Sequence, residues 1–494
     1  MERNLKPTSW DKEVDIVIVG YGGAGVAAAV TAHDLDAEVL IVEKAPEGQH
    51  GGNTRIAAQG YLNTEDAEQA TIYLTALCGP YTVPEAMIQT WAREMCLNND
   101  WMRSLGGDPQ EHQHQPEGIE YPEMPGAFCV HKFHDGPTYG YTFTWQRLES
   151  FVRERAIAVA YETPGRELIQ DGETGEIIGL RAERGGKPWF VKARRAVILT
   201  CGGFENNPEM IRNYLPGIAR CYPSGTPYNE GDGIAMAQAV GASLWHMNNY
   251  AGPSMALKVP DFPATLSIQA LHFSKEFPGG MIVVGPDGRR FYDEKFKHRH
   301  GKVPINGVWS PMQVPTPMYM IFDQAMMAAA PLYNKNPNRG WVPVMERYDW
   351  SDDNSAELAK GWIKQAATLA ELAEIIGLDP AALAGSVDRW NTQVAAGGDA
   401  DFGRKLMLTP FAGDGPYYAL ELSPSMINTQ GGPRRDEEAR ILKPDGTPIP
   451  RLYSAGELGS IYSYLYQGTG NIGECLAFGR IAGRNAAGET PLPA

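Results

Sequence analysis

The feature that most constrains this chain is a glycine-rich turn between a strand and a helix near the N-terminus. The segment Glu13–Gly20 reads EVDIVIVG, a β-branched run typical of a strand buried on both faces. It leads into Gly20–Gly25, GYGGAG, and then into a run of small residues. A second predicted strand, AEVLIVEK, leads to Glu43, close to the ~20 residues beyond the turn at which an acid that binds a ribose hydroxyl is expected. The pattern predicts a dinucleotide-binding βαβ unit whose glycines let a pyrophosphate approach the backbone.

A second glycine cluster distinguishes between the two common dinucleotide cofactors. Residues 51–60 read GGNTRIAAQG and follow soon after the predicted ribose-binding acid. A nicotinamide-binding domain would continue into a plain β-α-β unit at this point. Glycine and small polar residues instead let the backbone run close along a flat isoalloxazine ring. The sequence therefore predicts FAD as the cofactor.

The C-terminal stretch Leu452–Gly483 is predicted to meet the same cofactor. A short apolar strand ends in Gly456-Glu457, a loop rich in glycine and tyrosine follows, and a helix begins near Asn471. Because helix N-termini present unpaired N–H groups and the positive end of a dipole, they attract anionic or electron-rich ligands. We expect the flavin ring to lie here, with tyrosine hydroxyls holding a substrate carbonyl against it.

Length and charge limit the remaining possibilities. The 494 residues suggest two or three domains, because a domain typically has ~100–200 residues. The net charge of −16 excludes nucleic acid and an anionic membrane surface as partners, since both require basic patches. The sequence contains no apolar run of the ~18–20 residues that a membrane span needs. The N-terminus lacks the features of a signal peptide, so we expect a cytoplasmic protein.

The cysteines give no indication of a metal site. The six cysteines are scattered, without C-x-x-C or C-x-x-C-H spacing. This distribution excludes c-type haem and argues against zinc and iron–sulfur centres, so we predict no metal. Free thiols in a reducing compartment are the simplest interpretation.

The composition of the chain changes near Trp245, where proline, methionine and aromatic residues become frequent and long helical patterns rare. We interpret this change as the start of an inserted substrate domain. The segment NTQGGP at 428–433 lies again in the first domain. The predicted division assigns residues 1–245 and 413–494 to the cofactor domain and residues 246–412 to the substrate domain.

Four motifs are GGNT…AAQG at 51–60, CGGF at 201–204, RFYDE at 290–294 and NTQGGP at 428–433. They resemble motifs of the flavoprotein family of fumarate reductase, succinate dehydrogenase and 3-ketosteroid dehydrogenase. The resemblance implies an α/β fold, in which a Rossmann-like FAD-binding domain with a parallel sheet and a β-meander is interrupted by an α+β substrate domain. Thr54 occupies the position of the flavin-linked histidine of succinate dehydrogenases, so the implied FAD is non-covalent.

These motifs together predict the residues that contact FAD. They lie in the glycine turn, after the second strand, in the second glycine cluster, in CGGF, before a helix near position 232 and around the start of the last helix. The set is Gly20, Gly22, Gly23, Ala24, Gly25, Glu43, Lys44, Gly51, Gly52, Asn53, Thr54, Ala58, Gly60, Gly202, Gly203, Asp232, Gly456, Glu457, Gly470, Asn471 and Ile472.

The resemblance also implies catalytic residues. Fumarate reductases bind a dicarboxylate with an arginine in the loop before the last helix, and that position is Tyr466 here. Ketosteroid dehydrogenases have a tyrosine there, followed by a glycine whose N–H helps to bind the ketone oxygen, and Tyr466 and Gly470 match this pair. Counted from Arg290, the family's proton-transfer residue falls on His298, and Tyr121 matches a further active-site tyrosine. An exposed basic cluster around His298 and a buried loop aromatic at Tyr121 are the alternatives.

These assignments favour a dehydrogenase that introduces a C=C bond α,β to the ketone of a cyclic substrate. Tyr466 and the Gly470 N–H would stabilise the enolate oxygen. His298, with Tyr121, would remove the α-proton, and flavin N5 would accept hydride. The implied substrate is a 3-ketosteroid or a smaller alicyclic ketone such as 4-oxocyclohexane carboxylate, whose carboxylate could pair with Arg299 or His300. The electron acceptor stays open.

Two other functions also stay open. In an enoate reductase that resembles fumarate reductase, a shift of one residue would make Arg299 the proton donor in place of His298. A flavoprotein electron-transfer subunit would pass electrons to a partner without a substrate of its own.

Overall fold

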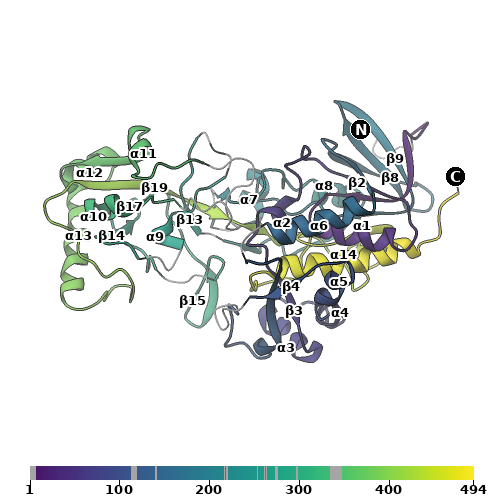
Figure 1. The fold of residues 1–494 in the computed structure, drawn as a ribbon, viewed down its shortest axis with the longest axis horizontal. Coiled ribbons are helices and arrows are strands. Elements are labelled where there is room, and N and C mark those ends of the chain that lie inside the picture. Colours follow the sequence, from purple (N-terminus) through teal and green to yellow (C-terminus); the bar gives the residue numbers. More distant parts are fainter. Residues whose placement is uncertain are drawn as a thin grey trace.

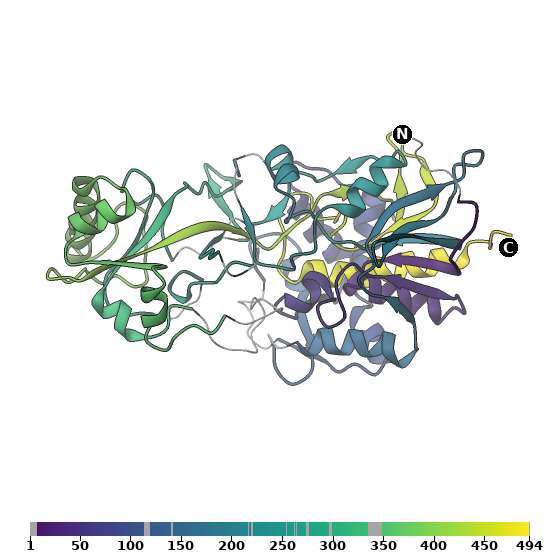
Figure 2. The same ribbon diagram turned by 90° about the horizontal axis from the view of Figure 1, so that it is seen from above.

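The computed structural model describes residues 7–112, 119–139, 142–215, 217–218, 221–252, 254–260, 262, 264–272, 276–295, 299–333 and 348–493. Two lobes lie end to end along the long axis (Figure 1), and the view from above separates them in the same way (Figure 2). The lobe on the right contains both termini, and the lobe on the left is built from the middle of the chain. The predicted α/β fold is confirmed, whereas the boundaries at 245/246 and 412/413 stay a prediction.

An eight-stranded sheet lies at the centre of the larger lobe. Strand β1 (Lys12–Val19) is parallel to β2 (Val39–Val42) on one side and to β9 (Lys187–Leu199) on the other. β9 is also parallel to β23 (Pro448–Ser454), so a strand from the end of the chain completes the sheet that the first strand begins. The other members are β6 (Ala158–Ala160), β22 (Arg440–Leu442), β7 (Gly165–Gln170) and β8 (Ile177–Arg184), of which β7, β8 and β9 form an antiparallel meander.

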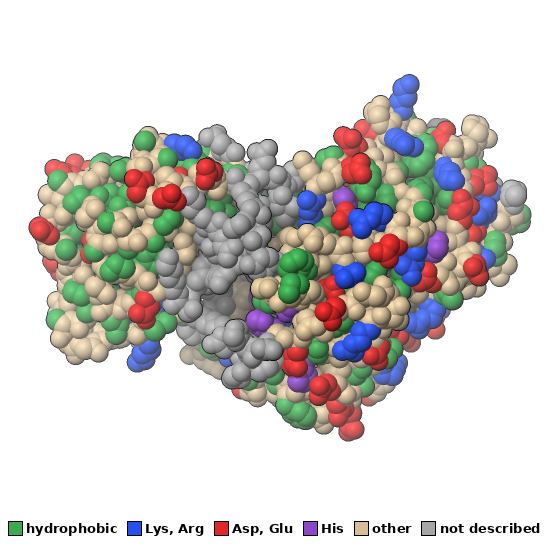
Figure 3. All heavy atoms as spheres, in the orientation of Figure 1, with side chains coloured by type: hydrophobic (Ala, Val, Ile, Leu, Met, Phe, Trp, Pro, Cys, Tyr) green, Lys and Arg blue, Asp and Glu red, His purple; other side chains and the backbone are tan. Residues whose placement is uncertain are grey.

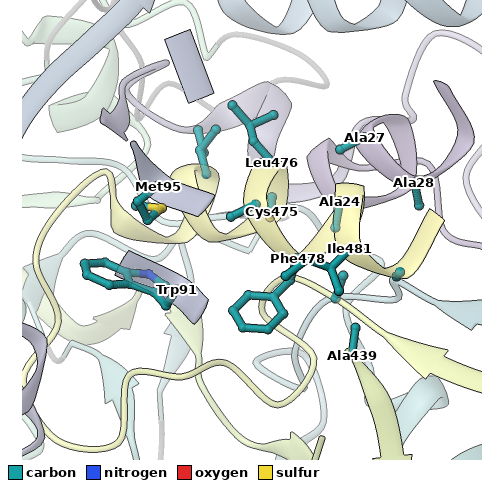
Figure 4. Packing of buried hydrophobic residues seen from close by; sticks show 14 of the residues in the cluster. Ala24, Ala27, Ala28, Trp91, Met95, Ala439, Cys475, Leu476, Phe478 and Ile481 are labelled. Carbon is teal, nitrogen blue, oxygen red and sulfur yellow. The ribbon is translucent and has the colours of Figure 1, made fainter. Parts of the chain in front are cut away.

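Helix α14 (Gly470–Gly488) packs along α1 (Gly23–His33). The two helices can approach closely because Gly479 and Gly483 have no side chain. A Cβ on Gly479 would lie 2.8 Å from the Ala24 carbonyl oxygen, and one on Gly483 would collide with Ala28. Figure 4 shows Ala24, Ala27 and Ala28 of α1 beside α14. The contacts run in the same order along both helices, from Gly23 beside Cys475 to Ala28 beside Gly483, so the helices are parallel and the first turns of α14 lie next to the glycine turn.

A small antiparallel sheet and several helices complete this lobe. The sheet consists of β3 (Tyr61–Thr64), β5 (Val130–Asp135) and β4 (Pro109–Glu111). The helices are α2 (Gly52–Ile56), α3 (Ala67–Cys78), α4 (Glu85–Met95), α5 (Asn98–Ser104), η1 (Ala127–Cys129), α6 (Phe143–Glu154), α7 (Pro208–Tyr214) and α8 (Asp232–Ala239).

The smaller lobe is organised around the long strand β19 (Tyr417–Met426). β19 pairs with β10 (Tyr222–Pro223), β13 (Ser254–Ala256), β17 (Met318–Asp323) and β18 (Ile363–Ala366), and β17 pairs with β14 (Met281–Val284). The helices of this lobe are α9 (Gln269–His272), α10 (Gln324–Ala329), α11 (Ser355–Ala359), α12 (Leu369–Ile376) and α13 (Pro380–Ala395).

Two short antiparallel strand pairs lie where the chain passes between the lobes. β11 (Leu244–Trp245) pairs with β21 (Gly432–Pro433), and β12 (Tyr250–Ala251) pairs with β20 (Asn428–Thr429). Next to them, the hairpin of β15 (Lys302–Ile305) and β16 (Val308–Pro311) extends from the junction (Figure 1). The junction therefore brings residues near position 300 to the loop that precedes α14.

The described ranges contain no helix that is long and apolar enough to cross a membrane. Within the same ranges, no cluster of three or more His, Cys, Asp and Glu side chains could hold a metal ion. All six cysteines are free thiols.

Candidate active site

A single cavity extends from the glycine turn to the loop before α14. At the turn, a Cβ on Gly25 would collide with the Gly20 carbonyl oxygen, and one on Gly20 would lie 2.5 Å from the Thr200 carbonyl oxygen. Gly20 also has φ 108°, which disfavours a side chain. Gly22, in contrast, lines the cavity, and a Cβ there would have no neighbour closer than 3.7 Å. The turn is thus tight at its two ends and open to a phosphate in its middle.

Glu43 lines the cavity beyond this turn, directly after β2. Its carboxylate accepts the Tyr21 N–H at 2.7 Å and the Ala45 N–H at 2.6 Å, and these two donors fix its orientation. Burial raises the pKa of Glu43. The neighbouring Lys44 donates to Asp232 Oδ2 at 2.7 Å and also pairs with Glu230, so its charge is compensated within the protein.

The middle of the cavity lies between α2 and the start of α14. Thr54 Oγ1 accepts the Gly23 N–H at 3.0 Å, which ties α2 to the glycine turn. Two polar atoms on the opposite wall, Thr469 Oγ1 and Asn471 Oδ1, are buried without a hydrogen-bond partner in the described protein. Buried polar atoms are normally paired, so these two indicate a polar ligand.

Most of the predicted cofactor residues line this cavity. The exceptions are Gly25, Gly51, Gly203 and Gly470, which are absent from its wall. Each of them lies where a side chain would meet protein instead: a Cβ on Gly51 would lie 2.8 Å from the Trp145 ring, and one on Gly203 would lie 2.6 Å from Glu205 Oε2. These glycines therefore shape the cavity through packing. Which residues contact FAD stays a prediction.

Residues from distant parts of the chain meet at the other end of the cavity. Its wall there contains Glu120, Lys132, Tyr139, His300 and Tyr466. Figure 3 shows the surface hollowed beside the junction of the lobes, with histidine side chains at the edge of the hollow. Except for Tyr466, sequence reasoning assigned none of these residues a catalytic role, because no motif connects segments that lie so far apart.

His300 is positioned by one contact of its imidazole ring and one of its backbone. Its Nε2 lies 2.8 Å from Glu120 Oε2, and its backbone carbonyl accepts the Gly252 N–H at 2.8 Å. Its φ of 48° is unusual for a residue other than glycine, and such backbone strain is concentrated at functional sites. Burial alone would raise the pKa of Glu120, but His300, Lys132 and the Gly468 N–H together lower it to about 2. The carboxylate is therefore ionised at neutral pH.

The Tyr466 ring lies against this histidine, with 4.7 Å between the ring centroids. Its phenol oxygen accepts the Asn471 N–H at 3.4 Å, and the Tyr462 ring supports it from the side, 5.2 Å away. Burial raises the pKa of Tyr466 well above its ordinary value. The phenol is therefore neutral and keeps a proton that it can donate in a hydrogen bond.

Two of the predicted catalytic groups do not face the cavity. The Gly470 N–H donates to the Gln467 carbonyl oxygen at 2.9 Å, and its predicted role as a donor to a substrate stays a prediction. Tyr121 is fully buried, and its ring packs edge-on against Trp309 at 5.5 Å. Tyr121 does not line the cavity, its hydroxyl is buried without a hydrogen-bond partner in the described protein, and its catalytic role stays a prediction.

The predicted base, His298, lies outside the described residues. The adjacent Arg299 does not line the cavity. Its guanidinium lies over the rings of Tyr121 and Trp309, at 4.9 and 4.8 Å, and pairs with Glu123. Among the described residues of this basic segment, His300 is the one that lines the cavity.

The glycine turn, the oriented Glu43 and the orphaned polar atoms at α14 fit a bound FAD, and with the parallel sheet they define a dinucleotide-binding flavoprotein. Comparison with known sequences agrees: the profile of the FAD binding domain family matches residues 15–472. The chain belongs to this family, and it is an FAD-dependent oxidoreductase. No covalent attachment is implied, because the group at position 54 is a hydroxyl, and non-covalent binding stays an expectation.

Individual relatives come from two functional groups. The chain is 27% identical over 489 residues to a cytochrome-type fumarate reductase of Shewanella frigidimarina, a match that covers 96% of this chain and 77% of that protein. It is 26% identical over 561 residues to 4-oxocyclohexanecarboxylate 2-dehydrogenase of Sinomonas cyclohexanicum, covering 96% and 93%. The structure of 3-ketosteroid delta1-dehydrogenase from Sterolibacterium denitrificans superposes with a TM-score of 0.75 at 22% identity, covering 97% and 100% of the two chains. The expected resemblance is confirmed.

Proposed function

We propose that this protein dehydrogenates a cyclic ketone, introducing a C=C bond α,β to the carbonyl group. The observation that carries the proposal is the contact between Tyr466 and His300 at the end of the cavity opposite the glycine turn. FAD, when bound, supplies the acceptor for the hydride. The protein supplies a hydrogen-bond donor that polarises the carbonyl and a base that removes the α-proton.

Tyr466 is the donor in this mechanism. An α-proton becomes acidic only when the carbonyl oxygen can carry negative charge, and a buried neutral phenol can donate a hydrogen bond to that oxygen. Because burial keeps the phenol protonated, the donor is present over the whole physiological pH range. A single donor of this kind contributes ~10²–10³ to kcat in related oxyanion sites.

His300 is the base, in the role that the sequence assigned to His298. Nε2 of the ring lies 2.8 Å from a Glu120 carboxylate oxygen, and Nδ1 would accept the proton. The ionised carboxylate orients the imidazole and stabilises the imidazolium that proton uptake produces, as a carboxylate does beside other catalytic histidines. Proton transfer by such a positioned side chain contributes ~10²–10⁴.

The charge balance of this end favours a ketone over a dicarboxylate. Lys132 Nζ lies 3.9 Å from Glu120 Oε1, so the lysine and the carboxylate compensate each other. A fumarate-type clamp requires an arginine that faces the substrate. The position expected for that arginine holds Tyr466. Arg299, the proton donor of the enoate reductase alternative, stacks on Tyr121 and Trp309 and pairs with Glu123. The dehydrogenase relative that acts on 4-oxocyclohexanecarboxylate also supports a cyclic ketone, either that size or a 3-ketosteroid.

Anaerobic reduction of the bound flavin tests the proposal. A panel of 3-ketosteroids, 4-oxocyclohexane carboxylate and simple cyclohexanones is mixed with the oxidised holoprotein, and succinate serves as the dicarboxylate control. We expect flavin bleaching with at least one cyclic ketone and none with succinate. In the reverse direction, reoxidation of the reduced flavin by fumarate but by no enone would replace the proposal with the enoate reductase. Absence of any reaction in both directions would support an electron-transfer subunit.

A further inference from the structure

Two carboxyl groups are buried together beside the middle of the cavity. Glu205 follows β9 and Glu457 follows β23, and these parallel neighbours end at the same edge of the sheet. Asn53 connects the two acids: its Nδ2 donates to Glu205 Oε1 at 2.7 Å and to Glu457 Oε2 at 3.1 Å. Glu457 forms part of the cavity wall, whereas Glu205 lies behind it and is only 1% exposed.

The orientation of the Asn53 amide is determined by its surroundings. The Thr226 N–H donates to Asn53 Oδ1 at 3.0 Å, so the oxygen is engaged and the NH₂ group must face the acids. Glu205 also accepts Asn229 Nδ2 at 2.8 Å and Thr429 Oγ1 at 3.5 Å. Glu205 therefore has three neutral donors, an arrangement that stabilises its ionised form.

No cation in the described part of the chain compensates the pair directly. The other titratable groups around it are Glu474, Arg435, Cys475 and Tyr466. Arg435 forms an ion pair with Glu474, and its Nη1 donates to the Leu458 carbonyl oxygen at 3.0 Å. The positive charge of Arg435 therefore compensates Glu474. Two adjacent carboxylates without a cation of their own cannot both remain ionised in a buried site.

The two acids differ in their ability to carry the negative charge. Burial raises the pKa of Glu205, and burial together with the neighbouring Glu205 carboxyl raises the pKa of Glu457 well above its ordinary value. Because Glu205 accepts hydrogen bonds from three neutral donors, it is the acid that is better stabilised as an anion, and the proton resides on Glu457, on the side of the cavity.

We propose that Glu205 is a positioning residue that keeps Glu457 protonated, so that Glu457 presents a neutral carboxyl group to the flavin instead of an anion. FAD already carries a negatively charged pyrophosphate, and reduction adds further negative charge to its ring. An anionic Glu457 in the wall would weaken cofactor binding and oppose reduction. The inference depends on the cofactor alone and is independent of the proposed substrate.

Binding of FAD to the apoprotein between pH 6 and 8.5 tests the inference, with flavin fluorescence as the measurement. In Glu205→Gln, the negative charge that opposes ionisation of Glu457 is removed. As the pH rises from 6 to 8.5, we therefore expect the FAD affinity of this variant to fall at least ~10-fold more than that of the wild type. Glu457→Gln, a neutral mimic, should bind FAD without this pH dependence. The double variant Glu205→Gln/Glu457→Gln should regain the wild-type profile. Glu209→Gln, the same change at an exposed position on α7, is the matched control.

The double variant separates the proposed role from a structural one. If Glu205→Gln has the pH profile of the wild type, or if Glu457→Gln does not rescue it, the proposal is wrong. Infrared spectroscopy provides a second measurement that does not need a folded Glu205 variant. The wild-type apoprotein at pH 8.5 should show the carbonyl stretch of a protonated carboxyl group that Glu457→Gln lacks, and absence of this band would also overturn the proposal.

Discussion

The two ends of the cavity are built in different ways. The nucleotide end consists mainly of backbone from consecutive elements, and its glycines work because they have no side chain. The catalytic end consists of side chains, Glu120, His300 and Tyr466, that come from three distant segments. Changes at the first end should therefore affect cofactor binding and folding. Changes at the second should affect turnover while FAD stays bound.

The largest effect is expected at the nucleotide end. In Gly25→Ala the new Cβ would collide with the Gly20 carbonyl oxygen, so the turn cannot close. We expect loss of FAD binding and a decrease of about 3 kcal/mol in the free energy of unfolding of the apoprotein, measured by denaturant titration. Gly172→Ala, in a turn where a Cβ would have no neighbour within 4 Å, is the control. Wild-type FAD affinity in Gly25→Ala would contradict the described geometry.

His300→Ala should give the largest effect at the catalytic end. Without the base, flavin reduction by the best ketone should slow by ~10³, while the dissociation constant for FAD stays within about twofold. Stopped-flow absorbance under anaerobic conditions measures the rate. If the rate stays near that of the wild type, His300 is not the base, and His298 becomes the residue to test.

Tyr466→Phe removes the phenol hydroxyl and keeps the ring. We expect a ~10²-fold lower rate of flavin reduction, because the carbonyl oxygen loses a hydrogen-bond donor. The ring contacts with His300 and Tyr462 persist, so FAD binding and thermal stability should change little. Tyr462→Phe, next to it but outside the cavity wall, is the matched control and should retain wild-type turnover.

Lys302, the first residue of β15, connects this strand to the loop before α14, and its contribution to the free energy of unfolding should depend on pH. Its Nζ donates to the Tyr464 carbonyl oxygen and to Asn249 Oδ1 at 2.6 Å, and burial lowers its pKa to about 7. Between pH 7 and about 10.4 the unfolded state then binds more protons, so the stability of the wild type rises with pH in this window.

Lys302→Met lacks this titration. The stability of the variant relative to the wild type should therefore fall by about 3 kcal/mol from pH 7 to pH 10, because each unit of pKa difference corresponds to about 1.4 kcal/mol. Urea unfolding at several pH values measures the difference. A difference that does not vary with pH would show that the pKa of Lys302 is not lowered.

The smallest effect is expected for Arg299→Ala. The guanidinium packs on two aromatic rings outside the cavity, so its loss should cost about 0.5–1 kcal/mol of stability and leave ketone turnover unchanged. Steady-state kinetics with an artificial electron acceptor measures turnover. A large loss of ketone turnover with intact FAD binding would show that Arg299 takes part in the reaction, contrary to this expectation.

The sequence predicted the cofactor end well and the catalytic end only in part. The glycine turn and Glu43 lie within a single βαβ unit, where local spacing determines the geometry. The local turn in which the Gly470 N–H reaches the Gln467 carbonyl oxygen has no clear sequence signature, and the role of Gly470 as a donor stays a prediction. Glu120 was missed because its partner His300 is brought to it only by the junction of the lobes.

By itself, the sequence determined that the chain binds FAD on a parallel sheet, because backbone shape near a phosphate depends on glycine spacing over a few residues. It also led to the prediction that Tyr466 lies in the active site, which stays a prediction. Only the tertiary structure decided that His300, supported by Glu120, faces this phenol, and that Glu205 lies behind Glu457. Such contacts between side chains depend on how distant segments pack, and no local pattern encodes that packing.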